Sequence, residues 1–509
     1  MRRPFTTQKP EDNTSPVESL SEKDLDLGSY AEKNLGGFSI LCTGFNICNS
    51  WAGLAATLAV GIAQGGTVTL LYGQILIFIL IGLGSTATLA ELTSVYPTAG
   101  GQYHWTSILA PKSTNRALSY FCGAANIFGW LSICTGVVIQ PGQFISAIVV
   151  FFNPDFEPQA WHIFLIYQAV NILILLYNIY LMKRTSWIHD VGFVVSLSLF
   201  IVITITCAAR APGHNSSTFV WTNFVNDSGW KSDGVVFLTG LANPNFMYAG
   251  IDGAIHLAEE CSNAITTVPL ALVSTSLIGF VTAFAFSISM VYSLVDLDAI
   301  INTPTGVPIY EIWYQATRSS TAATVFLAGL LAVSLFALNG CVQTASRLTW
   351  SYARDNALLG SSYIGQLHPR HNVPVWALVA NSAVIFIIGC IYLGSDTAFH
   401  GFVGTGLLLQ QISFAVPAAL LLYHRRSTKY LAKKRRVRLG FLGWIANALT
   451  VGFAVITLVF YCFPTEVPAT GSSMNYTVAV IGCMALFSTL NWVVHARRVY
   501  QGPRLPEGM

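Results

Sequence analysis

Long apolar stretches alternate with short polar segments along nearly the whole chain. A helix needs about 20 mostly apolar residues to cross the hydrocarbon core of a bilayer, and each of these stretches is long enough. The pattern therefore predicts an all-α polytopic membrane protein with twelve transmembrane helices, near residues 37–63, 68–94, 117–152, 160–181, 188–209, 234–257, 269–295, 321–345, 374–394, 399–423, 441–463 and 475–496.

The two ends of the chain are polar. Residues 1–36 are rich in charged residues, Ser, Thr and Pro, so we expect a disordered tail there and no cleaved signal peptide. Residues 497–509 are expected to form a second tail. Hydrophobic residues make up 53% of the chain and charged residues 10%, whereas a soluble domain carries about 25% charged residues. Residues 37–496 are therefore expected to form one membrane-embedded domain.

The distribution of Lys and Arg predicts the orientation. With the N-terminus in the cytoplasm, all 26 Lys and Arg residues except Arg210, Lys231 and Arg318 fall on inner segments or tails. This asymmetry follows the positive-inside rule and predicts that both termini are cytoplasmic. Asn215 and Asn226 begin N-x-S/T sequons on outer segments, so both are candidate glycosylation sites. The basic run at 429–438 resembles a nucleic-acid-binding segment, but beside a membrane span it favours anionic lipid, and we expect no nucleic-acid partner.

The sixth apolar stretch is interrupted. Asn243, Pro244 and Asn245 precede a small, flexible run that contains Gly250 and Asp252. Pro removes a backbone donor and Gly tolerates unusual backbone angles, so a continuous helix is not expected. A carboxylate at membrane depth costs about 3 kcal/mol and therefore has a partner or a function. One interpretation is a kinked helix with Asp252 as a cap, and the other is a substrate site at a helix break.

The first apolar stretch has a matching interruption, with polar and small residues at Gly44, Asn46, Asn49, Ser50 and Gly53. The sixth stretch comes five spans after the first, and because five is odd the two stretches enter the membrane from opposite faces. This arrangement is typical of inverted repeats with a binding site between broken helices. Small residues in membrane helices also serve as packing surfaces, and that alternative stays open.

Several motifs carry a family resemblance. They are AELTSVYPTAGGQYHW at 90–105, NSWAG at 49–53, Asp252 followed by HLAEE at 256–260, Ser346-Arg347 with ARDN at 353–356, and DLDAIINTPTGVPIYEIWYQA at 296–316. Together they resemble the amino acid–polyamine–organocation (APC) superfamily, in its fungal amino acid/choline transporter branch. The sequence is similar to fungal choline permeases and GABA permeases from about residue 36 to 495.

The resemblance implies a leucine-transporter-like fold with discontinuous helices 1 and 6. Repeat one would be 37–209 and repeat two 234–423, with additional helices at 441–496. It also implies that Ser50–Gly53 and Phe246–Asp252 are the unwound segments. This chain departs from many relatives at Ile251, where they have an aromatic residue. Its fifth span lacks a mid-membrane Lys, since His189 and Asp190 lie near the cytoplasmic end, so the coupling ion stays open.

The candidate substrate-binding residues lie on the two interrupted stretches and on the third span. They are Asn49, Ser50, Trp51, Ala52, Gly53, Trp130, Phe246, Tyr248, Gly250 and Asp252. A choline-like cation would need aromatic faces and a counter-charge such as Asp252. An amino acid would need donors for its carboxylate, which the N–H groups near Trp51–Gly53 would supply. The sequence supports both.

A second set of candidates is titratable. Asp252, His256 and Glu260 share one helical face, and Glu91 and His104 flank a Pro-Gly-Gly break. Their spacing matches no metal motif, so no metal site is expected. Glu91, His104, His256 and Glu260 are therefore candidates for proton coupling or for an inner gate of salt bridges.

The function predicted from these features is a secondary active permease for a small amine. A choline-like cation is the first candidate, coupled to a proton or another ion, in a fungal plasma membrane. The alternatives are an amino acid, GABA or polyamine permease, an exporter of an alkaloid-type metabolite, and a transporter-like nutrient sensor. An enzyme is not expected, because the sequence has no P-loop and no G-x-S-x-G turn, and we expect no cofactor.

Overall fold

The computed structural model describes residues 35–185, 187–471 and 473–503, and within them every regular element is a helix. Eleven helical stretches there are long and apolar enough to cross a membrane. They are α1–α2 (Gly37–Cys48, Ser50–Ala63), α3–η1–α4 (Gly66–Ile77, Phe78–Ser85, Thr86–Thr93), α6–α7 (Asn115–Val138, Gln140–Phe152), α8 (Ala160–Tyr180), α9 (Ile188–Arg210), α13 (Ala264–Tyr292), α16 (Ser320–Arg354), α18 (Val375–Gly394), α19 (Asp396–Tyr423), α20 (Leu442–Phe460) and α21–η5–α22 (Thr477–Asn491, Trp492–Ala496, Arg497–Val499).

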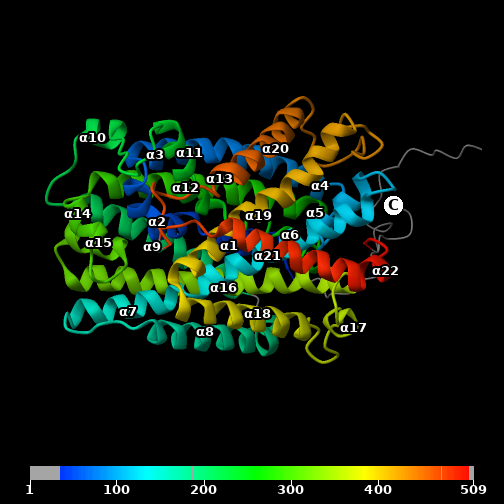
Figure 1. Cartoon of the computed structure of the whole chain (residues 1–509), viewed down its shortest axis with the longest axis horizontal. Coiled ribbons are helices and arrows are strands. Elements are labelled where there is room, and N and C mark those ends of the chain that lie inside the picture. The colour runs from blue at the N-terminus through cyan, green and yellow to red at the C-terminus, as the bar shows by residue number, and fades with distance from the viewer. Residues whose placement is uncertain (1–34, 186, 472, 504–509) are drawn as a thin grey trace, which may run out of the picture.

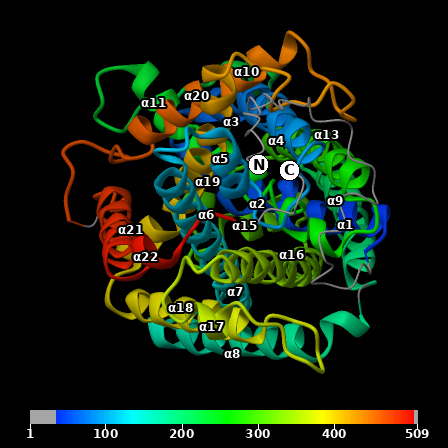
Figure 2. The ribbon, with the colours of Figure 1, turned by 90° about the vertical axis from the view of Figure 1, so that its right-hand side faces the viewer.

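Shorter helices connect the long ones. They are α5 (Gln102–Leu109), η2 (Met182–Arg184), α10 (Ser217–Thr222), α11 (Asp233–Gly240), α12 (Ala242–Asn245), η3 (Phe246–Tyr248), η4 (Ile255–Glu260), α14 (Leu297–Ile301), α15 (Pro308–Thr317) and α17 (Ser361–Ile364). The long helices run along the long axis of the molecule, with α10, α14 and α15 at one end and α17 and α22 at the other (Figure 1). Seen end-on, α8 and α18 form one side of the bundle and α20 the opposite side (Figure 2).

The first apolar stretch is interrupted at a single residue. Asn49 has left-handed backbone angles (φ 33°, ψ 57°), which Asn tolerates better than most residues. Helix α2 begins directly after it, because the Asn49 carbonyl accepts the Gly53 N–H at 3.0 Å. The expectation that Ser50–Gly53 is unwound is therefore wrong, since the bend is confined to Asn49.

The sixth apolar stretch is not one helix. Its short pieces α11, α12 and η3 are followed by a turn at residues 249–254, in which Gly250 has a φ of 78°, and then by η4. Pro244 fits inside α12 because the first turn of a helix leaves its N–H groups without intrahelical partners. The prediction that no continuous helix crosses the stretch 234–257 is therefore confirmed.

The two interruptions lie side by side. The Ser50 hydroxyl donates to the Met247 carbonyl at 2.6 Å. A Cβ atom at Gly53 would lie 3.2 Å from the Phe246 carbonyl oxygen, so α2 passes close to the backbone of η3. Glycine is what permits this approach.

Residues near both ends of the described chain are packed. Leu35 pairs with Cys261 in an isolated bridge, with Leu35 N donating to Glu260 O at 3.1 Å. Tyr500 is fully buried, and its hydroxyl lies 2.6 Å from the Ser119 hydroxyl. Both residues belong to segments that the sequence assigns to tails, whereas residues 1–34 and 504–509 of those tails lie outside the described chain.

Candidate functional site

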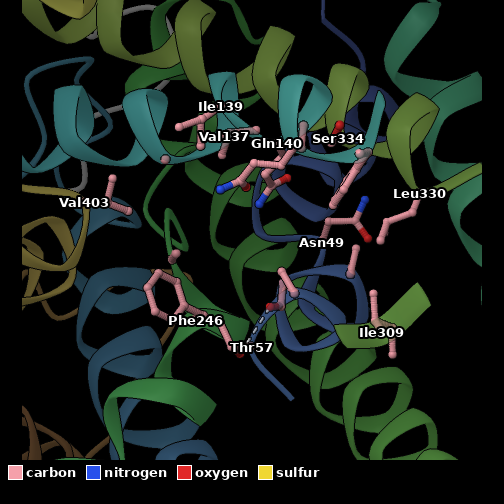
Figure 3. Close-up of a pocket in the computed structure, with 18 of the residues that line it drawn as sticks. Asn49, Thr57, Val137, Ile139, Gln140, Phe246, Ile309, Leu330, Ser334 and Val403 are labelled. Atoms are coloured by element: carbon pink, nitrogen blue, oxygen red, sulfur yellow. Dashed lines mark hydrogen bonds between the residues drawn. The ribbon is translucent and has the colours of Figure 1, made fainter. Parts of the chain in front are cut away.

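A cavity of about 390 Å³ lies beside the two interruptions (Figure 3). Asn49, Ala52 and Gly53 line it from the first, and Phe246 and Ala249 line it from the second. The other walls come from α6, α7, α16, α19 and the segment 306–309. Its volume is in the range of small-molecule sites, about 300–1,000 Å³.

The cavity is mostly apolar with a few neutral polar side chains. Among the residues described by the structure, no Asp or Glu lines it. Two phenylalanine rings, Phe144 and Phe246, are part of its wall. The polar side chains that line it are Asn49, Thr57, Gln140, Gln143, Ser334 and His400. Such a lining suits a ligand with an apolar or diffusely charged body and few hydrogen-bonding groups.

Asn49 is held by a short hydrogen-bonded chain that reaches α9. Trp51 Nε1 donates to the Ser196 hydroxyl at 2.9 Å, and that hydroxyl donates to Asn49 Oδ1 at 2.9 Å. The Asn49 amide nitrogen is left without a hydrogen-bond partner in the described chain. A buried donor without a partner is costly, so this N–H₂ group is the wall's clearest place for a ligand oxygen.

Three of the candidate substrate-binding residues lie behind the wall. The Ser50 hydroxyl is hydrogen-bonded to the Met247 carbonyl, and the Trp51 ring nitrogen to the Ser196 hydroxyl. The Tyr248 hydroxyl donates to the Ser276 carbonyl at 2.9 Å. All three side chains are buried and none lines the cavity.

Ile47 separates the cavity from the other three candidates, Trp130, Gly250 and Asp252. Ile47 lines the cavity, and a Cβ atom at Gly250 would lie 2.7 Å from Ile47 Cγ2 and 3.0 Å from the Trp130 ring. Trp130 Nε1 donates in turn to Asp252 Oδ2 at 3.4 Å. Asp252 is fully buried beyond this layer.

Asp252 accepts hydrogen bonds from side chains of four different elements. Gln102 Nε2 of α5 donates to Oδ2 at 2.7 Å, and Gln410 Nε2 of α19 donates to Oδ1 at 3.0 Å. Trp130 of α6 and His256 of η4 complete the set. The N-cap of η4 is Ala254 and has no side-chain cap. The alternative that Asp252 caps the second half of a kinked helix is therefore wrong.

Gln410 also fixes the turn that carries Asp252. Its Oε1 accepts the Gly250 N–H at 3.1 Å while its Nε2 binds the carboxylate. The two bonds use both ends of the amide, so they determine its orientation.

His256 links Asp252 to two other parts of the chain. Its Nδ1 lies 2.7 Å from the Ala99 carbonyl oxygen, which can only accept, so Nδ1 is the donor of that contact. Its Nε2 lies 3.1 Å from Asp252 Oδ2 and 3.4 Å from the Asn126 side-chain nitrogen. The imidazole therefore joins the Asp252 carboxyl group to the backbone at Ala99 and to α6.

On the C-terminal side of His256, two ion pairs join η4 to the C-terminal part of α16. Glu260 binds Arg347 at 2.6 Å and Glu259 binds Arg354 at 3.0 Å. The Leu35 bridge attaches to the same carboxyl end of η4. At this end of the Asp252 segment, two ion pairs hold η4 and α16 together.

His104 and Glu91 have separate partners. His104 Nε2 lies 3.3 Å from Asp355 Oδ2, which also accepts from the Tyr103 hydroxyl at 2.8 Å. Burial, and next the nearby Asp355 carboxylate, raise the pKa of Tyr103 well above its usual value, so its hydroxyl stays a donor. Glu91 binds Arg426 and Arg435 from the segment between α19 and α20. Each of the four titratable candidates, Glu91, His104, His256 and Glu260, therefore contacts a different partner.

Sequence reasoning missed several residues of these networks. Asn126 of α6 donates to Gln102 Oε1 at 3.0 Å and so belongs to the Asp252 network. Ser196, Gln410 and Asn126 are neutral and carry no motif, so no signal marked them. Gln102, Arg347 and Arg354 lie within the quoted family motifs, and Glu259 is next to a named candidate. For the arginines, the excess of positive charge on the inner segments was the available signal.

The two sequon asparagines use their amide nitrogens within the fold. Asn215 Nδ2 donates to the Val291 and Leu294 carbonyls at 3.0 and 2.8 Å. Asn226 Nδ2 donates to Asp233 Oδ1 at 2.8 Å. In the described chain, no group of three or more His, Cys, Asp or Glu residues is placed to hold a metal ion.

Comparison with known proteins adds the family. Residues 35–486 match the family model described as amino acid permease. The chain is 33% identical to a choline transporter of Saccharomyces cerevisiae over 96% of this chain and 87% of the relative. It is 31% identical to a swainsonine transporter of Arthroderma benhamiae over 92% of each chain. It is 26% identical to an amino-acid permease of Neurospora crassa over 96% of this chain and 90% of the relative.

Proposed function

Because the chain belongs to the amino acid permease family of the APC superfamily, we propose that it is a secondary active permease for a small amine. The chain is an integral, multi-pass membrane protein. A choline-like cation is the first candidate substrate. The observation that carries the proposal is the cavity between the two interrupted helical stretches, because discontinuous helices form the substrate sites of many secondary transporters.

We propose further that the broken segment 233–260 is the sixth of twelve transmembrane helices. Repeat one (37–209) and repeat two (234–423) would then form a leucine-transporter-like inverted pair, with 441–496 as additional helices. The adjacent interruptions at Asn49 and at residues 249–254 support this arrangement. The Lys and Arg distribution supports cytoplasmic termini, and a fungal plasma membrane is the proposed location.

The cavity lining supports a choline-like substrate. A trimethylammonium head forms no strong hydrogen bond and is stabilised by aromatic faces, which Phe144 and Phe246 offer. The hydroxyl at the other end of such a molecule would accept from the unpartnered Asn49 amide. A named relative is a choline transporter, which is consistent with this chemistry.

Amino acids, including GABA, are the second candidate class. The carboxylate of such a substrate would accept a hydrogen bond from the Asn49 amide, just as the hydroxyl oxygen of a choline-like molecule would. A relative named as an amino-acid permease supports this class. A relative named as a swainsonine transporter is consistent with an alkaloid-type substrate, and export of such a metabolite stays an alternative. The polyamine and nutrient-sensor alternatives have no specific support from the cavity.

Coupling is proposed to act through Asp252 and His256. The two side chains are 3.1 Å apart and buried, and the short helix η4, which contains His256, also carries the ion pairs Glu260–Arg347 and Glu259–Arg354. Gain or loss of a proton by this pair would leave a buried charge without compensation. Such a change would favour release of the inner ion pairs.

Uptake measurements test the proposal. The chain is expressed in a fungal strain that lacks its own permeases and is given radiolabelled choline, ethanolamine, GABA, a polyamine and neutral amino acids. We expect choline to accumulate against its gradient. Phe246→Ala should raise the KM for choline, while the control Phe487→Ala, which removes an exposed ring on α21, should leave the KM unchanged. No accumulation of any substrate by protein present at the membrane would overturn the proposal.

A further inference from the structure

The segment between α19 and α20, residues 424–441, is the most basic part of the chain. It contains eight Lys and Arg residues and no Asp or Glu. It lies at the same end of the molecule as the described C-terminal residues, beyond the ends of α19 and α20 (Figure 1). We call it the basic loop.

The basic loop is fastened to the helix bundle. Arg435 Nη2 binds Glu91 Oε1 at 2.8 Å, Arg426 binds the other oxygen of Glu91, and the Leu439 N–H also donates to Glu91. The Tyr96 hydroxyl donates to the Tyr430 carbonyl at 2.7 Å. Burial raises the pKa of Tyr96 to about 12, so this hydroxyl stays protonated at neutral pH. The loop therefore has a defined shape on which its remaining charges are held.

Six cations of the basic loop face outward. Their side chains are exposed, and none has an ion-pair partner in the part of the chain that the structure describes: Arg425, Lys429, Lys433, Lys434, Arg436 and Arg438. Glu91 is already shared by two arginines, so it does not neutralise them. The loop presents a concentrated positive surface without an internal counter-charge.

Exposed apolar side chains flank this surface. Tyr423 at the end of α19 is 71% exposed, and Phe441 and Leu442 at the start of α20 are 77% and 65% exposed. Aromatic residues in such positions concentrate at the boundary between hydrocarbon and lipid headgroups. The rings thus place the six cations at headgroup depth, within reach of lipid phosphates.

We propose that the basic loop is a binding surface for anionic phospholipid headgroups of the cytoplasmic leaflet. The orientation rests on the proposed topology, while the charge and its fastening to Glu91 stand without it. Lys and Arg attract anionic lipid at a membrane surface, and the attraction grows with each added cation. The exposed rings favour lipid over a soluble polyanion, because a soluble ligand gives them nothing to bury against.

Native mass spectrometry of the purified full-length chain tests the proposal. The protein in detergent is titrated with phosphatidylserine or with phosphatidylcholine, and lipid-bound species are counted. We expect clear preference for phosphatidylserine. The variant Lys433→Gln, Lys434→Gln, Arg436→Gln, Arg438→Gln should weaken phosphatidylserine binding by about tenfold or more and leave phosphatidylcholine binding unchanged.

A matched variant controls for total charge. It replaces four exposed cations elsewhere on the same side with Gln: Lys112, Arg184, Arg497 and Arg498. It should retain wild-type preference for phosphatidylserine. Equal losses in both variants, unchanged binding in the loop variant, or displacement of the lipid by free glycerophosphate would each overturn the proposal. Because the readout needs no transport, it is independent of the substrate proposed above.

Discussion

Replacing Asp252 by Asn preserves the side-chain shape and removes its charge. The consequence can be worked out from its partners, because all four of them donate: Gln102, Gln410, Trp130 and His256. An Asn amide presents N–H₂ in place of one carboxylate oxygen, so a donor then faces a donor. Among the described neighbours of this network, the Asn126 Oδ1 atom is a buried acceptor without a partner, but Asn126 bonds Gln102 and not Asp252.

Gln410 cannot rotate to correct the mismatch, because its Oε1 accepts from the Gly250 N–H at 3.1 Å and that backbone donor cannot turn. Gln102 Oε1 accepts from Asn126 at 3.0 Å, so turning Gln102 requires Asn126 to turn as well. The mismatch at Gln410 therefore remains. An unsatisfied buried donor costs about 1–3 kcal/mol. If His256 keeps both protons, the broken buried pair brings the total cost to about 3–5 kcal/mol.

Two measurements on purified protein in vesicles test this reasoning. Asp252→Asn should lower the thermal unfolding temperature and abolish uptake driven by a pH gradient. Exchange of labelled for unlabelled substrate, which needs no net proton movement, should decline less. The control Asp155→Asn removes an exposed carboxylate between α7 and α8 that does not line the cavity, and such surface substitutions usually change stability by less than about 0.5 kcal/mol.

A result that contradicts the argument is easily recognised. If Asp252→Asn melts at the wild-type temperature and still accumulates substrate, the network neither needs the charge nor carries the proton. Substrate recognition would then rest on Asn49, Phe246 and the remaining cavity wall.

Four further substitutions test other contacts. Asn49→Val should reduce uptake at least about tenfold, because a β-branched residue is strained at a φ of 33°, while cell-surface amounts measured by biotinylation stay close to normal. Arg347→Gln should increase maleimide labelling of Cys48 from the cytoplasmic side, because it removes the ion pair to Glu260; unchanged labelling would contradict a gating role. Asn226→Gln should remove a glycan-dependent shift in gel mobility, seen by comparing glycosidase-treated with untreated protein. Asn215→Gln should lower the unfolding free energy by about 1–3 kcal/mol, because its hydrogen bonds to two carbonyls are lost. Its unfolding is measured with and without glycosidase treatment.

The sequence by itself determined the helical membrane class and the family. Backbone hydrogen bonds must be satisfied within the chain in lipid, so a membrane helix needs a long apolar stretch, and the class is readable from the pattern of apolar residues. Twelve spans were predicted, and eleven helical stretches of the described residues are long and apolar enough to cross a membrane. The two interruptions were also readable, because Asn, Pro and Gly mark the positions where the backbone departs from a helix. The eleven described candidate spans and the broken path at 233–260 agree with that pattern.

The tertiary structure alone decided which side chains face the cavity. Trp51 and Tyr248 were reasonable aromatic candidates, yet each finds a hydrogen-bond partner behind the wall, in Ser196 and Ser276. The unwound segment of the first stretch shrank to Asn49 because the next helix could start at once. Helical periodicity predicts which side chains share one face of a helix. It does not predict which group on another helix forms a hydrogen bond with each of them.

The Asp252 network shows the physical reason. Its donors Gln102 and Gln410 lie 150 and 158 residues away in sequence and are neutral amides, and no local pattern indicates that their partner is Asp252. They become partners only because helix packing encloses a carboxylate that must be satisfied by whatever donors surround it. Local sequence determines where a helix forms and where it breaks, whereas the pairing of buried polar groups is decided when the helices pack.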